Sequence, residues 1–388
     1  MIRFDRVTKR FPDGTVAVDE LDLTAPTGRI TVLVGPSGCG KTTSLRMVNR
    51  MIEPTSGTIH LDGRDTADLD AAELRRGIGY VIQHAGLFPH KTIVDNIGTV
   101  PGLLGWDRAR IRARSMELLE RVGLDPAVAR RYPAQLSGGQ QQRVGVARAL
   151  AADPPVMLMD EPFSAVDPVV REQLQDEFLR LQGELGKTIV FVTHDIDEAI
   201  KMGDEVAVLR VGGRLAQIAD PAYLLTHPAD DFVADFVGRD RGYRALSFQA
   251  APRLPLHPER TLVLGEPTGR ADEWALVVDE DNRPQGWVEP ARLQGRPATQ
   301  ADLARGGTVA RAGGSLRAAL DAALSSPSRR GVIVDDAGEL VGTVRAHEVL
   351  AAIEDAERPE RRDAEDEVRA TEERLDEGRL TDIGRADP

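Results

Sequence analysis

A short glycine-rich segment between an apolar run and a helix-forming run constrains the fold of this chain more than any other feature. It reads GPSGCGKTT, from Gly35 to Thr43; it follows ITVLV and precedes SLRMVNRM. The segment fits the pattern G-x-x-x-x-G-K-[ST] in the strand, loop and helix context in which the pattern is meaningful. Glycines at positions 35, 38 and 40 allow backbone N–H groups to approach phosphate oxygens. The sequence therefore predicts a phosphate-binding loop at the end of a buried strand.

Two side chains of this loop carry the expected chemistry. Lys41 is placed to reach terminal phosphates, and the Thr42 hydroxyl to bind Mg²⁺. Composition supports a specific role for Lys41. Only 5 of the 49 basic residues are lysines, at positions 9, 41, 91, 187 and 201, so a basic position without such a role would usually carry arginine. The alternatives are a glycine-rich turn without a ligand and, for Cys39, either a small buried filler or a reactive thiol. The motif context favours the ligand-binding turn and the filler.

An apolar strand that ends in two acids is the second candidate feature. It reads VMLMDEP, from Val156 to Pro162. Ligands of open parallel sheets bind at the carboxyl ends of the strands, so Asp160 is placed to hold Mg²⁺ through water. Glu161 is the candidate base that orients an attacking water. A pair of acids at the end of a strand is common by itself. In a chain that also has a phosphate-binding loop, the pair is stronger evidence for a metal-binding and catalytic role.

A second candidate anion site begins at Leu136, in the stretch LSGGQQQRVGVARAL. Ser137 and Gln140 satisfy the S-x-x-Q capping box, which predicts a helix start at Gly138. A helix N-terminus opened by small residues presents unpaired N–H groups and the positive end of the helix dipole. The alternative is an ordinary well-capped helix with two glycines.

Alternating strand and helix patterns predict an α/β fold from Met1 to about Gly238. Nearly continuous apolar runs are typical of strands covered on both faces. Between Phe88 and Leu136 the pattern is helical, which indicates a helical subdomain inserted into the sheet domain. The predicted strand segments are RITVLVG, GIGYVIQ, PVMLMDE, TIVFVTH and EVAVLRVGGRLAQIA.

Composition excludes several classes of protein. Hydrophobic content is 41% and charged content 29%, as in soluble globular proteins. No apolar run approaches the roughly 18 residues of a membrane span, and the start MIRFDRVTKRF lacks the apolar block of a secretory signal. One cysteine excludes an internal disulfide and a cysteine-based zinc site, and a net charge of −13 argues against a nucleic-acid-coating role. We therefore expect a cytosolic protein.

The composition changes after Gly238. The Pro- and Arg-rich stretch RGYRALSFQAAPRLPLHPER is predicted to be a connector. Two similar segments follow, WALVVDEDNRPQGWVEPARL and RGVIVDDAGELVGTVRAHEVL, with turns 55 to 57 residues apart, which indicates a weak internal repeat. From Glu354 to Pro388 there are 14 acidic and 7 basic residues, a pattern typical of a solvated helix or a disordered tail.

Together these features resemble the nucleotide-binding subunit of an ATP-binding cassette (ABC) transporter. The resemblance covers Met1 to about Gly238 and includes every expected motif in order. Gly35 to Thr43 match the Walker A loop, and Asp160 and Glu161 end Walker B. The remaining matches are Phe11, where Tyr is usual, for the adenine-stacking aromatic; Gln83 in YVIQHAGLFPH for the Q-loop; Leu136 to Gln140 for the signature; Ser164 to Asp167 for the D-loop; and His194 in FVTHD for the switch histidine.

The resemblance implies an ATPase that uses ATP and Mg²⁺. In this family two cassettes pack head to tail, with each ATP between the Walker A loop of one and the signature of the other. One set of motifs per chain therefore implies a homodimer with two composite sites. The implied catalytic residues are Glu161, His194, Gln83 and Lys41; the metal site is Thr42, Gln83 and Asp160; and the nucleotide site is Phe11, Gly35, Pro36, Ser37, Gly38, Cys39, Gly40, Lys41, Thr42, Thr43, Ser137, Gly138, Gly139 and Gln140.

Three classes of ABC protein compete: a transport ATPase, a soluble protein of DNA repair or translation, and a regulatory module with a vestigial site. The single cassette, the short separation of Thr42 from Ser137 and the intact Lys41 and Glu161 favour the transport ATPase. The stretch QHAGLFPHKTIVDNI resembles the importer form of the region that faces the permease. The implied partners are transmembrane permease subunits and, indirectly, a substrate-binding protein, with no nucleic acid. The implied location is the cytoplasmic face of the cell membrane.

The segments ALVVDEDNRPQGWV and GVIVDDAGELVGTV resemble a pair of CBS repeats, the first degenerate. A cassette followed by such a pair is the layout of ATPases for uptake of osmoprotectants such as glycine betaine, proline betaine, choline or carnitine. Import of another small solute, such as an amino acid or polyamine, and a non-transport ATPase are the alternatives. Many CBS repeats bind adenosine ligands through a Thr or Ser and an Asp. Arg345 and Glu348, and Glu289 and Arg292, stand at those positions, which argues against adenosyl binding.

The expected architecture is an α/β P-loop cassette with a helical subdomain, followed by a small α+β CBS-type domain. Two hypotheses are open for the acidic tail: it tunes transport to ionic strength, or it is a solvated extension without a role. The expected ranges are 1–238 for the cassette, 239–258 for the linker, 259–355 for the CBS-like pair and 356–388 for the charged tail.

Overall fold

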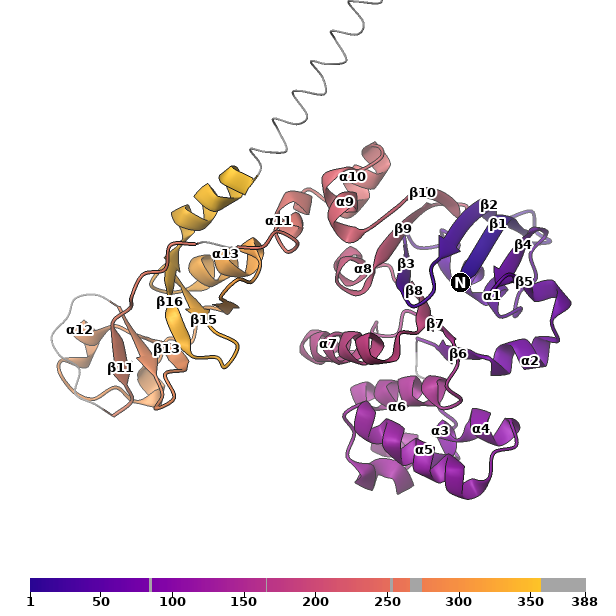
Figure 1. Ribbon diagram of the computed structural model, residues 1–388, viewed down its shortest axis with the longest axis horizontal. Helices are drawn as coiled ribbons and strands as arrows, with labels where there is room; N and C mark the ends of the chain where they lie inside the picture. Colours follow the sequence, from indigo (N-terminus) through magenta and orange to yellow (C-terminus); the bar gives the residue numbers. More distant parts are fainter. Residues whose placement is uncertain (84–85, 165, 252–253, 266–273, 357–388) are drawn as a thin grey trace, which may run out of the picture. The chain divides into compact units, whose positions relative to one another are not determined.

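The computed structural model describes residues 1–83, 86–164, 166–251, 254–265 and 274–356. The chain divides into two compact units, Met1–Arg239 and Asp240–Pro388 (Figure 1). Nearly all of the expected charged tail, and Ala165 of the expected D-loop, lie outside the described ranges. Within those ranges, no helix combines the length and the apolar character that a membrane span requires.

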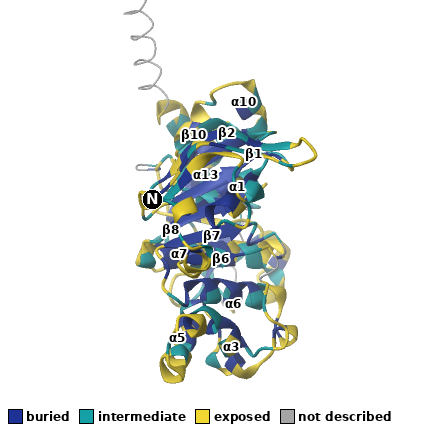
Figure 2. Cartoon of the chain, turned by 90° about the vertical axis from the view of Figure 1, so that its right-hand side faces the viewer, coloured by how far each residue is buried: buried dark blue, intermediate teal, exposed yellow. Residues whose placement is uncertain are grey.

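A six-stranded sheet forms the centre of the first unit, in the order β10-β9-β3-β8-β7-β6. The strands from β9 to β6 are parallel, and β10 is antiparallel to β9. All residues of β3, β7 and β8 are buried, as in apolar strands covered on both faces (Figure 2). The predicted strand segments are confirmed, and the last one forms a hairpin. The strands are β3 (Ile30–Val34), β6 (Ile78–Val81), β7 (Val156–Asp160), β8 (Thr188–Val192), β9 (Glu205–Arg210) and β10 (Arg214–Ala219).

A second, antiparallel sheet in the order β2-β1-β4-β5 shares an apolar core with the first. In β1, Ile2, Phe4 and Val7 are fully buried between more exposed neighbours, which explains the apolar and charged alternation at the start of the chain. This sheet is absent from the predicted strands, because bulges in β1 break the strict alternation that marks a half-buried strand. Its strands are β1 (Ile2–Arg10), β2 (Val16–Ala25), β4 (Ser56–Leu61) and β5 (Arg64–Asp65).

Three helices begin where parallel strands end. Helix α1 (Lys41–Val48) follows β3 and contacts β7 and β8 of the first sheet and β2 of the second. Helix α7 (Pro168–Leu185) follows β7, and α8 (Ile196–Met202) follows β8 and packs on β3. Their first turns therefore meet at one edge of the sheet. The other elements of this part are η1 (Thr66–Asp68), α2 (Ala71–Arg76), α9 (Pro221–Thr226) and α10 (Asp231–Val237).

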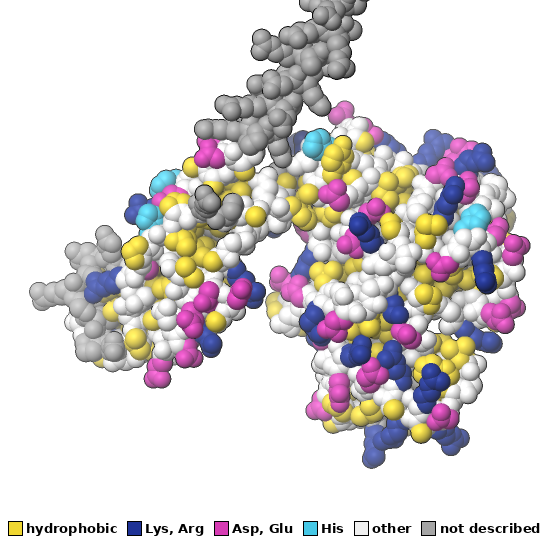
Figure 3. Space-filling view, in the orientation of Figure 1, with side chains coloured by type: hydrophobic (Ala, Val, Ile, Leu, Met, Phe, Trp, Pro, Cys, Tyr) yellow, Lys and Arg dark blue, Asp and Glu magenta, His cyan; other side chains and the backbone are white. Residues whose placement is uncertain are grey.

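Helices fill the segment between β6 and β7, so the helical subdomain predicted between Phe88 and Leu136 is confirmed. Figure 2 shows their buried faces turned inward and their exposed faces outward. Basic side chains gather at the end of the unit where α5 exposes Arg108, Arg110 and Arg112 (Figure 3). The elements are α3 (Ile93–Ile97), α4 (Thr99–Leu103), α5 (Arg108–Arg121), η2 (Pro126–Arg130), η3 (Pro133–Gln135) and α6 (Gly138–Leu150).

The second unit contains two three-stranded sheets of the same design. In each, the first strand is parallel to the middle strand and the last is antiparallel to it, with an irregularity just before the turn. The predicted internal repeat is confirmed. The elements are α11 (Arg241–Ala245), β11 (Thr261–Val263), β12 (Ala275–Val278), β13 (Pro284–Val288), α12 (Pro290–Leu293), η4 (Gln300–Asp302), β14 (Val309–Arg311), α13 (Leu316–Ser325), β15 (Arg330–Val334), β16 (Leu340–Arg345) and a helix over residues 346–356.

Two of the apolar cores in this unit join its parts. One lies between the sheets and includes Leu276 and Trp287 of the first repeat and Val332 of the second. The other packs α13 and the helix 346–356 against the second sheet, around Ile333 and Val344. The two repeats therefore form a single folded body.

The predicted linker, 239–258, differs from what is observed. Tyr243 and Leu246 pack into the core around α13, and His257 pairs with Thr343 of β16 through two backbone hydrogen bonds. The Pro- and Arg-rich composition conceals these contacts because few of its residues are apolar. Most of this stretch thus belongs to the second unit, which begins at Asp240.

Candidate functional site

The loop between β3 and α1 has backbone geometry that only glycine satisfies. A Cβ on Gly35 would lie 2.4 Å from the carbonyl oxygen of Leu209, and one on Gly40 2.1 Å from that of Ala17. Gly38 has a φ of +78°, and the space beside it is open. The loop is therefore pressed against β9 and β2 on its inner side, while its outer side is free for a ligand.

Lys41 begins α1 and turns back beneath its own loop. Its ammonium donates hydrogen bonds to the carbonyl oxygens of Gly35, at 2.7 Å, and Pro36, at 3.0 Å. The Cys39 sulfur lies 3.7 Å from the same ammonium and is fully buried. The positive charge of Lys41 is thus held at the centre of the loop, where an anion would face it.

The Thr42 hydroxyl joins α1 to the end of β7. Its Oγ1 donates a 2.8 Å hydrogen bond to Oδ1 of Asp160, a buried carboxylate. Burial raises the pKa of Asp160 above its usual range, against the hydrogen bond from Thr42 and the charges of Arg46 and Lys41. A hydroxyl and a carboxylate held together in this way are the hard oxygen ligands that Mg²⁺ prefers.

Glu161 lies between two side chains from neighbouring strands. Gln83, after β6, donates to Glu161 Oε2 at 3.3 Å, and His194 Nδ1, after β8, lies 3.1 Å from Oε1. Glu161 has a φ of +45°, a conformation that non-glycine residues rarely adopt and that often marks functional sites. The parallel order of β6, β7 and β8 brings these three predicted catalytic residues together at one edge.

One cavity of about 320 Å³ unites the loop with Glu161. Its size is that of a small-molecule site. Most of the predicted nucleotide-binding residues of the loop line it, and Gly35 and Pro36 lie beneath through their carbonyl contacts with Lys41. The lining residues are Ala17, Ser37, Gly38, Cys39, Gly40, Lys41, Thr42, Thr43 and Glu161.

Three residues near this site are missing from the sequence predictions. Ala17 of β2 lines the cavity. Arg46 lies one helical turn after Thr42 and acts on Asp160 and on Tyr80 of β6 through its charge. Burial, with the charge of Asp160, raises the pKa of Tyr80. The i+4 spacing of Arg46 from Thr42 is the only signal in the sequence that points to it.

The LSGGQ segment forms a capped helix start away from this cavity. The Ser137 N–H donates to Gln140 Oε1 at 3.0 Å, and the Gln140 N–H donates to Ser137 Oγ at 3.3 Å. The predicted capping box and the helix start at Gly138 are confirmed. None of Ser137, Gly138, Gly139 and Gln140 is among the residues that line the cavity.

Phe11 lies in the turn between β1 and β2. Its N–H donates to Thr15 O at 2.9 Å, and the Lys9 ammonium lies 5.5 Å from its ring centroid. Ala17, in the strand that follows this turn, lines the cavity. Contact of Phe11 with adenine stays a prediction.

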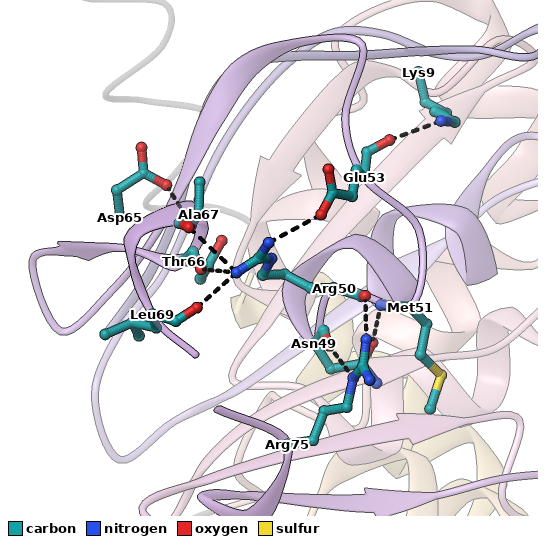
Figure 4. A network of polar contacts seen from close by, with 10 residues as sticks. All are labelled: Lys9, Asn49, Arg50, Met51, Glu53, Asp65, Thr66, Ala67, Leu69 and Arg75. Atoms are coloured by element: carbon teal, nitrogen blue, oxygen red, sulfur yellow. Dashed lines mark hydrogen bonds and ion pairs between the residues drawn. The ribbon is translucent and has the colours of Figure 1, made fainter. Parts of the chain in front are cut away.

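The far end of α1 is anchored by two arginines (Figure 4). Arg75 donates to the carbonyl oxygens of Asn49, at 3.1 Å, and Arg50, at 2.6 Å, which close the helix. Arg50 donates to Glu53 Oε1 at 2.9 Å. Helix C-terminal carbonyls lack intrahelical partners, so these contacts fix the end of the helix that carries Lys41 and Thr42. Arg50 also donates to the carbonyl oxygens of Thr66, Ala67 and Leu69, at 3.3, 3.2 and 2.6 Å.

In the second unit, the four positions with expected adenosine-site roles are paired with the chain itself. Glu289 and Arg292 form an ion pair at 2.5 Å. Glu348 accepts the Arg345 N–H at 2.8 Å and contacts His257 Nε2 at 2.6 Å. The side chains of Glu289, Arg292 and Glu348 and the backbone N–H of Arg345 are therefore engaged within the unit.

Comparisons with known proteins give a consistent family. The pattern of the family described as "ABC transporter" matches residues 18–164. The osmoprotectant import ATP-binding protein OsmV of Salmonella typhimurium is 45% identical over 361 residues, covering 89% of this chain and 94% of that protein. The glycine betaine uptake system ATP-binding protein YehX of Escherichia coli is 50% identical over 261 residues, covering 67% and 84%.

Solved structures resemble the chain as well. A dimeric post-hydrolysis state of the ATP-binding cassette MJ0796, bound to ADP and Pi, is 34% identical with a TM-score of 0.52, covering 57% of this chain and 99% of that chain. The protein cbiO1 from Clostridium perfringens, part of the ABC transporter complex cbiONQ, is 27% identical with a TM-score of 0.54, covering 58% and 90%.

Proposed function

The chain belongs to the ABC transporter family, and from that premise we propose that it is the ATP-hydrolysing subunit of an importer for a quaternary-amine osmoprotectant such as glycine betaine. The observation that carries the ATPase part is the single cavity lined by the phosphate loop and Glu161. Phosphoryl transfer needs phosphate binding, a metal and an oriented water at one place, and little other chemistry from the protein.

The donor set of this cavity fits ATP with Mg²⁺. The backbone N–H groups of the loop and the Lys41 ammonium would hold the phosphates, and Thr42 and Asp160 supply the oxygen ligands, 2.8 Å apart. Gln83, the third predicted metal ligand, contacts Glu161 instead in this arrangement. Bound Mg²⁺ would neutralise charge that develops on the transferred phosphoryl group.

Glu161 would act as the base. A water beside it gives a proton to the carboxylate while its oxygen bonds to the terminal phosphorus and the bond from phosphorus to ADP breaks. His194 and Gln83, at 3.1 and 3.3 Å, hold the carboxylate in one orientation. His194, the predicted switch histidine, would respond to the transferred phosphoryl group through its contact with the Glu161 carboxylate.

A homodimer would complete the site. A helix start such as the one at Ser137 is typical of an anion site, because the N–H groups of a first turn lack intrahelical partners, and the cavity of its own chain does not include it. Head-to-tail pairing would bring it to the partner's terminal phosphate, giving two equal composite sites. The dimeric cassette of known structure supports this assembly.

The class of solute rests on the relatives. The protein that aligns with 89% of this chain is named for osmoprotectant import, and YehX is named for glycine betaine uptake. Their names favour an osmoprotectant over an amino acid or polyamine, and import over a non-transport ATPase. The permease and the substrate-binding protein would determine which solute is imported. This subunit would bind the permease at the cytoplasmic face of the membrane.

The segment that begins at Phe88 is the candidate permease contact. Asn96, fully buried, accepts from the Phe88 N–H at 2.7 Å and donates to the carbonyl oxygens of Phe88, Lys91 and Thr92. Phe88 is 39% exposed. An exposed apolar side chain on this anchored segment, five residues after Gln83 in the sequence, would link permease movement to Glu161.

The second unit would be a regulatory CBS-like pair that does not use an adenosyl ligand. The ion pair of Glu289 with Arg292, and the contacts of Glu348 with the Arg345 N–H and His257, engage three of the four side chains at the expected ligand positions. Burial opposes the ionised form of Glu348, but its contacts with His257 and the Arg345 N–H lower its pKa.

Uptake of labelled glycine betaine tests the function. A strain without its own betaine importers would express this chain together with its permease and substrate-binding protein. We expect uptake that Glu161→Gln abolishes and that Glu172→Gln, an exposed change on α7, leaves intact. Uptake that survives Glu161→Gln would contradict the ATPase role, and uptake of amino acids or polyamines alone would contradict the osmoprotectant.

A further inference from the structure

The proposed catalytic pair is Glu161 with His194. The side chain of Arg171 contacts both the segment that follows Glu161 and the turn that follows His194. It lies in the first turn of α7. Its Nη2 donates a 3.0 Å hydrogen bond to the carbonyl oxygen of Val166, in the segment between Glu161 and α7. Its Nη1 lies 4.0 Å from Oδ2 of Asp195, the residue that follows His194. We propose that Arg171 is a positioning residue for ATP hydrolysis that keeps His194 paired with Glu161.

These contacts close a ring around the catalytic pair. Ser164 Oγ donates to the Glu161 carbonyl oxygen at 2.9 Å, which folds the segment after β7 back on itself. His194 Nδ1 lies 3.1 Å from the Glu161 carboxylate. The ring therefore runs from Glu161 through Ser164 and Val166 to Arg171, and returns through Asp195 and His194. Arg171 joins its two halves.

Asp195 is held in a fixed orientation toward Arg171. It is the N-cap of α8, and its Oδ1 accepts from the N–H groups of Asp197, at 2.9 Å, and Glu198, at 3.3 Å. Its own N–H donates to Thr193 Oγ1 at 3.0 Å. With one carboxylate oxygen used for the cap, the other is left for Arg171. A shift of Arg171 would therefore act on the whole turn that carries His194.

A second contact between α7 and α8 lies one helical turn farther along. Gln175 Nε2 donates to Glu198 Oε1 at 3.0 Å, and both side chains are buried. Burial raises the pKa of Glu198. Because Gln175 follows Arg171 by four residues, both side chains project from the same face of α7 toward α8. The two helices are thus clamped at two levels.

These contacts leave one nitrogen of the Arg171 guanidinium, Nε, buried without a hydrogen bond to any described residue, which is energetically unfavourable. Its pairing with Asp195 is partly exposed, at 30% and 38% for the two side chains, and such pairs add little stability. Stability alone does not account for the arrangement, whereas positioning of the two turns does.

Steady-state ATP hydrolysis by the full-length chain tests this role. We expect Arg171→Ala to lower kcat about tenfold with KM for ATP changed less than about twofold, because small displacements at a reacting centre reduce rates strongly. Arg171→Lys, which keeps the charge and loses the fork, should restore part of the loss. The matched control is Arg180→Ala, which breaks an exposed ion pair with Glu184 on the same helix and should leave kcat unchanged.

A double-mutant cycle separates positioning from general destabilisation. Asp195→Asn keeps the cap acceptor but removes the charge that faces Arg171. If Arg171 acts through Asp195, the double variant loses no more kcat than Arg171→Ala alone. An unchanged kcat in Arg171→Ala, a loss matched by Arg180→Ala, or losses that multiply in the double variant would each overturn the proposal. The inference rests on the proposed ATPase function, but its failure is distinct: in that case the wild-type chain still hydrolyses ATP.

Discussion

Thr42 Oγ1 donates a 2.8 Å hydrogen bond to Asp160 Oδ1, which ties the first turn of the phosphate-loop helix to the end of the central strand β7. The two residues are far apart in the sequence and come from different motifs. The bond orients the two oxygens that the proposed Mg²⁺ would use. It also supplies a donor to a carboxylate that is buried.

Loss of the Thr42 hydroxyl should affect both metal use and stability. We expect Thr42→Ala to weaken activation of ATP hydrolysis by Mg²⁺ at least about tenfold. Unfolding free energy should fall by about 1–2 kcal/mol, because the buried Asp160 loses its donor. Mg²⁺ titrations of ATPase activity and chemical denaturation measure the two effects. Thr42→Ser retains the hydroxyl and should behave as wild type; equal losses in both variants would contradict the role of the hydroxyl.

Asp160 should make stability depend on pH. Burial raises its pKa above the ordinary value of 3.8. A carboxyl with a raised pKa favours the folded state fully below the unfolded value, and this contribution is lost as pH rises through the folded pKa. Asp160→Asn cannot ionise, so its melting temperature should exceed that of wild type at pH 7 to 8, with the difference shrinking toward pH 4. A difference that is constant with pH would contradict this account.

The parts of this molecule that local patterns determine could be predicted from the sequence. The phosphate loop and its strand, the helical insertion and the capping box at Ser137 each depend on neighbours in the sequence, and each is found as predicted. The antiparallel sheet was not predictable in this way, since bulges interrupt its alternation. Arg46, Arg50 and Arg171 act on partners distant in the sequence, so no spacing identifies all of their contacts. The packing of Tyr243 and Leu246 into the core around α13 and the pairing of His257 with Thr343 are of the same kind.

Ser137 should matter for hydrolysis more than for nucleotide binding. Ser137→Ala removes the N-cap of α6 and should lower the unfolding free energy by about 1 kcal/mol. In the proposed dimer it would also lower ATP hydrolysis at least about tenfold, since a donor to the partner's phosphate is lost. Binding of a fluorescent ATP analogue by the monomer should be unchanged. Ser137→Thr keeps the cap and serves as control, and weaker binding by Ser137→Ala would contradict a site completed by the partner.

Glu161→Gln should separate binding from turnover. The amide keeps the size of the carboxylate and its place between Gln83 and His194, but it cannot accept the proton of the attacking water. We expect ATP binding to persist, kcat to fall by about 10² or more, and ATP to hold the chain as a dimer in size-exclusion chromatography. Glu161→Gln that stays monomeric with ATP, while it binds the nucleotide, would argue against the composite site.

The anchoring of α1 by Arg75 should be a stability feature that leaves the chemistry largely intact. Arg75 donates to the carbonyl oxygens of Asn49 and Arg50, at 3.1 and 2.6 Å, where α1 ends (Figure 4). Without it, those carbonyls turn to water or stay unpaired, so Arg75→Ala should lower the unfolding free energy by about 1–2 kcal/mol. Arg76→Ala is the matched control, because Arg76 is an exposed neighbour in the same turn of α2.

Chemical denaturation measures the loss of stability in Arg75→Ala, and steady-state kinetics measures the reaction. Lys41 and Thr42 lie at the opposite end of α1 from these contacts. We therefore expect kcat and KM for ATP to change less than about twofold at temperatures where the variant is folded, a change below about 0.4 kcal/mol in transition-state stabilisation. A kcat that falls in Arg75→Ala while its unfolding free energy matches that of Arg76→Ala would show that the end of the helix acts on the site directly.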